Sequence, residues 1–239
     1  MTSTSAFWLL ALGFVLGLRH AFDADHLAAV STMTGGRGSL FGSSLIGALW
    51  GLGHTISLMI AGVLVMLLHF QISERTTRAL EFCVGLMLIG LGVNALQKLV
   101  RGGHVHMHQH EHRGRWHVHP HLHAGKHEDE PLTHHGMKLS ARPLLIGLVH
   151  GMAGSAALTL LVLTTIPSPL FGFIYIGIFG IGSIGGMMIM STLFALPARL
   201  TARRFTRADL VLRGLAASFS FSFGAVMVYD IGFVDHFLM

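Results

Sequence analysis

Six long apolar segments dominate this sequence and restrict it to the membrane. They cover about 6–30, 43–68, 79–100, 143–165, 170–196 and 214–234. Each approaches or exceeds the roughly 20 residues that an α-helix needs to cross the hydrocarbon core of a bilayer. Charged residues make up only 11% of the chain and its mean hydropathy is +0.64, which excludes an ordinary soluble domain. The sequence therefore predicts an all-α, polytopic membrane protein with six transmembrane helices.

The two halves of the chain resemble each other in their first two apolar segments. The run Gly-Leu-Arg-His at 17–20 matches Gly-Leu-Val-His at 147–150, and Trp-Gly-Leu-Gly-His at 50–54 matches Phe-Gly-Ile-Gly-Ser at 179–183. The third segments of the halves align poorly. Because three is an odd number of spans, the second copy of a three-span repeat inserts with the opposite orientation, as in the inverted repeats of secondary transporters. We therefore expect a three-helix repeat at 1–100, a polar loop at 101–140 and a second three-helix repeat at 141–239.

Arginine and lysine predict the orientation of the chain. The first, third and fifth connections hold almost all of them, whereas the opposite side has only Arg75 and Arg78. Basic connections remain in the cytoplasm. We therefore expect both termini outside and the long polar loop inside, in a multi-pass protein of the inner (plasma) membrane.

A cluster of ionisable residues, Arg19 to His26, interrupts the first apolar segment. It reads Arg-His-Ala-Phe-Asp-Ala-Asp-His, and such groups are expensive within a bilayer, so they indicate a functional site. On a continuous α-helix, His20, Asp23 and His26 fall within an arc of about 120°, while Asp25 lies about 100° from His26. Asp25 reaches the same site if the helix is locally unwound. Alternatively, it does not touch the metal and hydrogen-bonds to the ring of a histidine that does.

Imidazole and carboxylate together suit a divalent first-row metal such as Ni, Co or Zn. The alternative is that Arg19 and the aspartates merely neutralise one another at a membrane interface, which leaves two closely spaced histidines unexplained. If the ligand interpretation holds, Arg19 balances the carboxylates when no metal is bound.

Two further histidines, His54 and His150, lie near the middle of the second and fourth apolar segments. A site role is favoured for His54, because its repeat counterpart is also polar. For His150, a ligand and a buried histidine bonded to a neighbour fit equally well. The second half lacks the carboxylates of the first, so the predicted site is asymmetric. The candidate metal ligands are His20, Asp23, Asp25, His26, His54 and His150, with Arg19, Ser155, Thr159, Ser183 and, more weakly, Asn94 along the pathway.

Twelve of the 18 histidines lie between His104 and His135. Many alternate with other residues: His104, His106, His108, His110, His112, His117, His119, His121 and His123. In a polar segment this pattern is typical of a flexible metal-binding tract. A β-strand is the alternative, which we disfavour because apolar residues do not alternate with the histidines. A tract without fixed geometry should bind several metals with little discrimination.

The stretch from Arg19 to His26 resembles the H-x4-D-H signature of the nickel/cobalt transporter superfamily. Leu-Gly-His-Thr at 52–55 resembles that family's second Gly-His segment, and the run from His150 to Leu158 is similar to its urease-accessory branch. The resemblance implies passage of Ni²⁺ or Co²⁺, with His20, Asp25 and His26 as signature residues. Typical members have more spans, carry the signature on the second helix and follow it with Asp-Asn, where this chain has Ser31-Thr32.

A permease for Ni²⁺, and secondarily Co²⁺, is therefore the first functional hypothesis. Uptake is favoured by the urease-accessory resemblance, and export fits the same residues. An intramembrane hydrolase is the competing class, but the pattern H-E-x-x-H is absent, and Ser155 is poorly placed relative to His150 on one helix. We expect no enzymatic activity, no resident cofactor and no nucleic-acid partner. The expected partners are the metal ion, the lipid bilayer and, as a candidate, a cytoplasmic metallochaperone.

Overall fold

The computed structural model describes residues 3–34, 39–67, 73–100, 105–112, 115–122, 141–152, 168–202, 206–235 and 237. Most of them are helical. The elements are α1 (Ser3–His20), α2 (Ala24–Met33), α3 (Leu40–Met66), α4 (Glu74–Val100), β1 (Val105–His112), β2 (Arg115–Leu122), α5 (Arg142–Gly151), α7 (Pro169–Ala202), α8 (Thr206–Tyr229) and a π-helical segment η1 (Asp230–Val234).

Four of the described helices are long and apolar enough to cross a membrane. They are α3, α4, α7 and the continuous stretch from Leu210 to Val234 in α8 and η1. The bent pair of α1 and α2 passes the same test as a unit and makes a fifth candidate span. The chain is therefore a multi-pass membrane protein. The fourth expected span, at 143–165, begins with α5 and continues into residues 153–167, which lie outside the described part of the chain.

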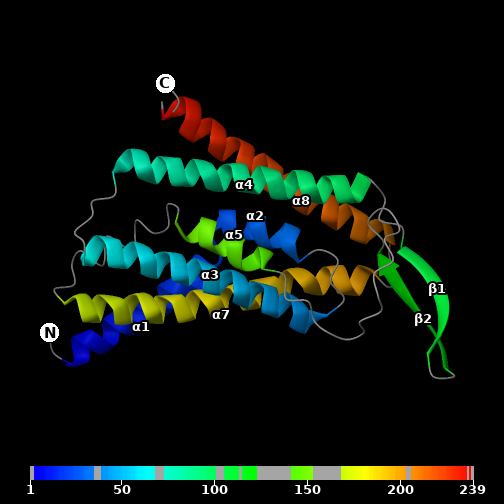
Figure 1. Cartoon of the computed structure of the whole chain (residues 1–239), viewed down its shortest axis with the longest axis horizontal. Coiled ribbons are helices and arrows are strands. Elements are labelled where there is room, and N and C mark those ends of the chain that lie inside the picture. Colours follow the sequence, from blue (N-terminus) through cyan, green and yellow to red (C-terminus); the bar gives the residue numbers. More distant parts are fainter. Residues whose placement is uncertain are drawn as a thin grey trace.

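The long helices pack in pairs, and two short helices lie among them. The most extensive contacts join α3 with α7, α4 with α8, α1 with α7 and α3 with α5. In Figure 1, α2 and α5 lie between the α4/α8 pair and the group formed by α1, α3 and α7. The contacts of α2 with α8, α4 and α7, and of α5 with α3 and α4, agree with this view. Both short helices therefore lie within the bundle, between its two groups of long helices.

Glycine permits the closest of these helix contacts. A Cβ atom at Gly17 of α1 would overlap the carbonyl oxygen of Phe179 on α7. A Cβ at Gly147 of α5 would likewise overlap the carbonyl oxygen of Trp50 on α3. Such contacts hold membrane helices together through van der Waals packing, because lipid provides little hydrophobic drive for their association. They place the ends of α1 and α5 directly against α7 and α3.

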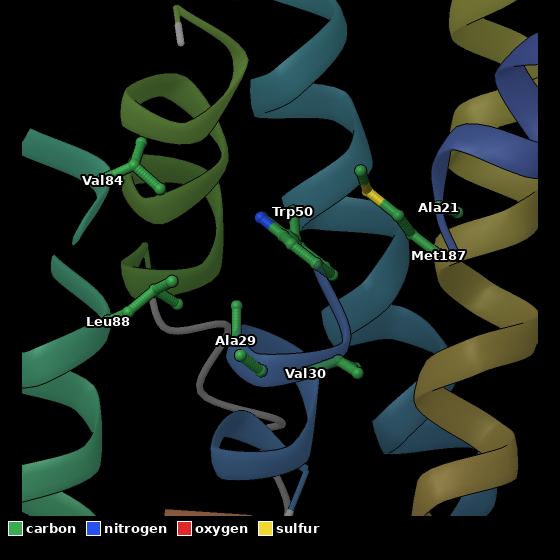
Figure 2. Packing of buried hydrophobic residues seen from close by; sticks show 8 residues of the cluster. Ala21, Ala29, Val30, Trp50, Val84, Leu88 and Met187 are labelled. Carbon is green, nitrogen blue, oxygen red and sulfur yellow. The ribbon is translucent and has the colours of Figure 1, made fainter. Parts of the chain in front are cut away.

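A buried apolar cluster surrounds α2. It contains Ala21, Ala28, Ala29, Val30, Trp50, Val84, Leu88 and Met187. Figure 2 shows Val84 and Leu88 of α4 on one side of Ala29 and Val30, with Trp50 and Met187 on the other. The small side chains of α2 let both groups of helices approach it. Its orientation within the bundle is therefore fixed by packing on two sides.

The histidine-rich loop contains a β-hairpin. Strands β1 and β2 are antiparallel, and their register pairs His106 with His121, His108 with His119 and His110 with His117. Our preference for a tract without strands is therefore wrong for these residues. The strands do carry alternating apolar residues, such as Val105 and Met107 in β1, and antiparallel backbone pairing also needs no apolar face. His104, His123 and the remainder of the tract lie outside the described residues.

Candidate metal centre

The first apolar segment is broken at the residues that carry the charges. Helix α1 ends at His20, and the N–H groups of Phe22 and Asp23 donate to the carbonyl oxygens of Arg19 (2.9 Å) and His20 (3.1 Å). Helix α2 then begins at an angle of 55° to α1. The continuous helix expected across this segment is therefore wrong, and the local unwinding that we considered as an alternative is present. The break turns Asp25 toward the histidines.

Each carboxylate of the stretch is bonded to histidine. Asp23 Oδ2 lies 2.7 Å from Nδ1 of His20. Asp25 accepts from the backbone N–H of His26 (2.9 Å), and its Oδ1 lies 3.0 Å from Nδ1 of that ring. Its other oxygen, Oδ2, lies 2.8 Å from Nε2 of His150 at the end of α5. A carboxylate that accepts from one ring nitrogen fixes the tautomer and leaves the opposite nitrogen of a neutral imidazole with a free lone pair.

The four imidazoles are buried and incompletely hydrogen-bonded. His26 and His54 are fully buried, and His150 and His20 are 1% and 8% exposed. Nε2 of His26, Nδ1 of His54 and Nδ1 of His150 have no hydrogen-bond partner among the described residues. Buried polar atoms without partners are uncommon because each loses its hydration without compensation. Three such nitrogens in one place indicate a binding site for a ligand that accepts lone pairs.

The histidines form two overlapping groups that could hold a metal ion. One consists of His20, His26 and His54, and the other of Asp25, His26 and His150. In each group, one potential ligand atom per residue lies within 4.8 Å of the others. Within the first group, Nε2 of His20 and Nε2 of His54 are 3.2 Å apart. Nitrogen-rich donor sets with one carboxylate suit Ni, Co or Zn better than Mg or Ca.

Two aromatic residues that we did not predict as site residues line this cluster. The ring of Trp50 on α3 lies 5.2 Å from that of His26 and 5.8 Å from that of His150, between centroids. Phe179 on α7 lies 5.7 Å from the ring of His20. Both are buried. The signal that could have found them is the match between the two halves, in which these aromatic residues occupy equivalent positions.

The remaining predicted residues divide into three groups. Ser183 is fully buried on α7, and its hydroxyl has no partner among the described residues. Asn94 on α4 and Arg19 on α1 have exposed side chains and belong to neither of the two ligand groups. Ser155 and Thr159 lie outside the described residues. The structure therefore brings together the histidines and aspartates of the predicted site, with Ser183 as a buried polar neighbour of α1.

Comparison with known proteins identifies the family. Over 228 residues the chain is 36% identical to the urease accessory protein UreH of Bacillus sp. (strain TB-90), an alignment that covers 95% of this chain and 93% of that protein. The chain belongs to the UreH family. This confirms the resemblance to the urease-accessory branch that the histidine and glycine motifs predicted.

More distant relatives are plant proteins. The Arabidopsis thaliana chloroplast proteins FOR GROWTH AND FERTILITY 1 and 2 are 26% and 27% identical over 193 and 177 residues. These alignments cover 78% and 73% of this chain but only 50% and 44% of the plant proteins. No family model matches the chain, and no solved structure matches it.

Proposed function

We propose that this UreH-family protein is a permease that carries Ni²⁺, and less readily Co²⁺, across the inner membrane into the cell. The observation that supports this most directly is the cluster of buried imidazoles with unpaired nitrogens inside a bundle of membrane helices. Ionisable groups at that depth mark ion pathways. The choice of nickel rests on the superfamily resemblance and on the similarity to a urease accessory protein.

In this proposal the ion is held by His20, His26 and His54. Asp23 and Asp25 support the first two rings through Nδ1, so that their Nε2 atoms bind the metal. Such carboxylate–histidine–metal arrangements orient the ring and raise its basicity. His54 comes from α3, on the other side of the cluster from α2. The site would thus join three elements, which lets a movement of helices make or break it.

We also propose that the chain is built from two inverted repeats of three spans. Supporting contacts occur in matched pairs. Gly17 abuts Phe179, as Gly147 abuts Trp50, and Gly182 abuts Phe14, as Gly53 abuts Leu144. In each pair, the two residues of one contact are the sequence counterparts of the two residues of the other contact, as a pseudo-two-fold axis requires. Six spans follow if the segment at 143–165 crosses the membrane with α5, which would make it the counterpart of α1 and α2.

Nickel flux into proteoliposomes of the purified protein is the decisive experiment. The wild type should accumulate Ni²⁺ faster than empty vesicles, and varying the metal and pH gradients would identify the driving force and the direction. His20→Ala, Asp25→Asn and His26→Ala should each abolish flux while the protein still inserts into the membrane.

Asn94→Ala serves as a matched control, because this exposed polar residue lies outside the two ligand groups. Its flux should equal that of the wild type. Near-normal flux in any two of the three site variants would contradict the site. Transport by none of the proteins, including the wild type, would contradict the permease itself.

A further inference from the structure

His26 belongs to both ligand groups and lies between their other histidines. Its ring centroid is 4.4 Å from that of His20 and 4.2 Å from that of His150. The centroid of His54 is 5.0 Å from that of His20 but 6.3 Å from that of His150. His26 also lies 5.3 Å from His54, so its ring is within 5.3 Å of the other three. An ion bound among His20, His26 and His54 is next to a second set of ligands that shares one ring with the first.

The two groups differ in their exposure. His20, His26 and His54 of the first group are at most 8% exposed. In the second group, His26 and His150 are at most 1% exposed, but Asp25 is 25% exposed. Asp23, which supports His20, is 52% exposed. The exposed parts of the cluster are therefore its carboxylates, and its imidazoles are enclosed by protein.

The atoms of the second group already have the spacing of metal ligands. Two ligand atoms at right angles around an ion, each about 2.1 Å from it, lie about 3.0 Å apart. The oxygens of Asp25 lie 3.0 Å from Nδ1 of His26 and 2.8 Å from Nε2 of His150. Each of these two spacings could therefore be spanned by a divalent ion that takes the place of the shared proton.

We propose that the transported ion occupies two overlapping stations in turn, a first station of His20, His26 and His54 and a second station of Asp25, His26 and His150. This inference rests on the proposed permease function and adds the path inside the protein. His26 would bind the ion through Nε2 in the first station and through Nδ1 in the second, so the same ring serves both stations while the ion exchanges its other ligands. One ion is transferred at a time, because two divalent ions so close together would repel each other strongly.

The matched contacts of the two halves support this assignment. His150 corresponds to His20, and Trp50, which packs on His150, corresponds to Phe179, which packs on His20. In an inverted repeat, equivalent positions of the two halves face opposite sides of the membrane. The second station would thus be the exit counterpart of the first.

A double-mutant cycle on Ni²⁺ binding tests the two stations. The full-length chain is used, with the histidines at 104–135 replaced by serine to remove competing sites. His20→Asn and His150→Gln each keep an amide donor where Nδ1 of His20 and Nε2 of His150 now donate to the aspartates. With two stations, each single variant still binds one Ni²⁺ with at most about a tenfold loss of affinity, and the double variant loses at least about 100-fold and more than the product of the two single losses.

Nickel flux provides the second readout. Either single variant should bind Ni²⁺ but transport it at least about tenfold more slowly at saturating metal, because transfer between stations is blocked. Retained binding also shows that the variant is folded. Losses that simply multiply in the double variant, or a His150→Gln protein without any binding, would indicate one shared site. Wild-type flux in His150→Gln would overturn the second station alone, whereas an inactive wild type would overturn the permease as well.

Discussion

At the scale of single residues, the positions of two carboxylates decide which imidazole nitrogens remain available. Asp23 supports one ring, whereas Asp25 bridges His26 and His150 through its two oxygens. His54 differs, because its described polar contact is with Nε2 of His20. It is therefore the histidine whose role depends least on hydrogen bonds to acids.

In a His150→Gln background, where only the first station remains, His54→Gln should lower the affinity for Ni²⁺ by at least about tenfold, because this station loses one of its three rings. Equilibrium dialysis measures this affinity directly, in the full-length chain whose histidines at 104–135 are replaced by serine. Ser43→Ala is the matched control. Ser43 is also buried on α3, but it lies 11 residues earlier, about 16 Å along the helix. An unchanged affinity in His54→Gln, or an equal loss in both variants, would argue against His54 as a ligand.

At the scale of elements, glycine contacts fix how closely α1 and α5 approach their partners. Gly17→Ala adds a Cβ that would overlap the backbone of α7 and should destabilise the protein by about 1–3 kcal/mol. Thermal unfolding in detergent, followed by tryptophan fluorescence, should show a lower Tm. The control is Gly90→Ala on α4, where no described atom lies within 4 Å of the new Cβ.

Gly90→Ala should leave the Tm unchanged or raise it slightly, because alanine is the better helix former. A Tm for Gly17→Ala equal to that of the control would mean that α1 and α7 are not held together at this contact. Gly147→Ala, at the equivalent contact of α5 with α3, should behave as Gly17→Ala does if the halves are repeats.

The β-hairpin lies apart from the helices that carry the candidate site. In Figure 1 it projects beyond one end of the bundle. Replacing residues 104–135 with a Gly/Ser linker should lower the number of bound metal ions by several but leave flux at saturating metal largely intact. The tract would act by raising the local metal concentration near the pathway, an effect that saturating metal hides.

Binding to this tract should also fall as the pH drops below about 6.5, because a protonated imidazole has no lone pair for a metal. Metal counting between pH 5 and pH 8 tests this, with the linker variant as the reference. A folded linker variant that is inactive at saturating metal would place the hairpin within the transport path.

At the scale of the whole molecule, the chain ends and the hairpin lie at opposite ends of the bundle. Figure 1 shows both chain ends on the side away from β1 and β2, the N-terminal end at the lower left and the C-terminal end at the upper left. The positive charges of the odd-numbered connections predict that the hairpin end faces the cytoplasm. All connections at the hairpin end should therefore face the same side of the membrane, so the orientation can be tested at any one of them.

Cysteine labelling in intact cells tests the orientation. The native Cys83 is exposed on α4, so it is first replaced by serine. A cysteine placed near Arg204 should react only with a reagent that enters the cytoplasm, and one near Pro167 should react with an impermeant reagent outside. The reverse pattern would overturn both the orientation and the cytoplasmic position of the histidine-rich tract.

The sequence by itself determined the class of protein, its family and which residues are candidates for a site. Apolar length identifies membrane helices, and the stretch from Arg19 to His26 places ionisable residues within one apolar segment. The class and the candidate residues need no tertiary information, because they depend on the free energy of placing a segment or a side chain in lipid. The family depends on the motifs themselves.

Only the tertiary structure decided how the site residues meet. Helical periodicity separated Asp25 from His26, whereas the break after His20 brings Asp25 to both His26 and His150. After the break, α2 packs against α8, α4 and α7, and these contacts are contained in no local pattern. The same holds for Trp50 and Phe179, whose apolar side chains give no sign of which histidine they will cover. The identity of a ligand follows from local chemistry, but its position depends on contacts between residues far apart in the chain.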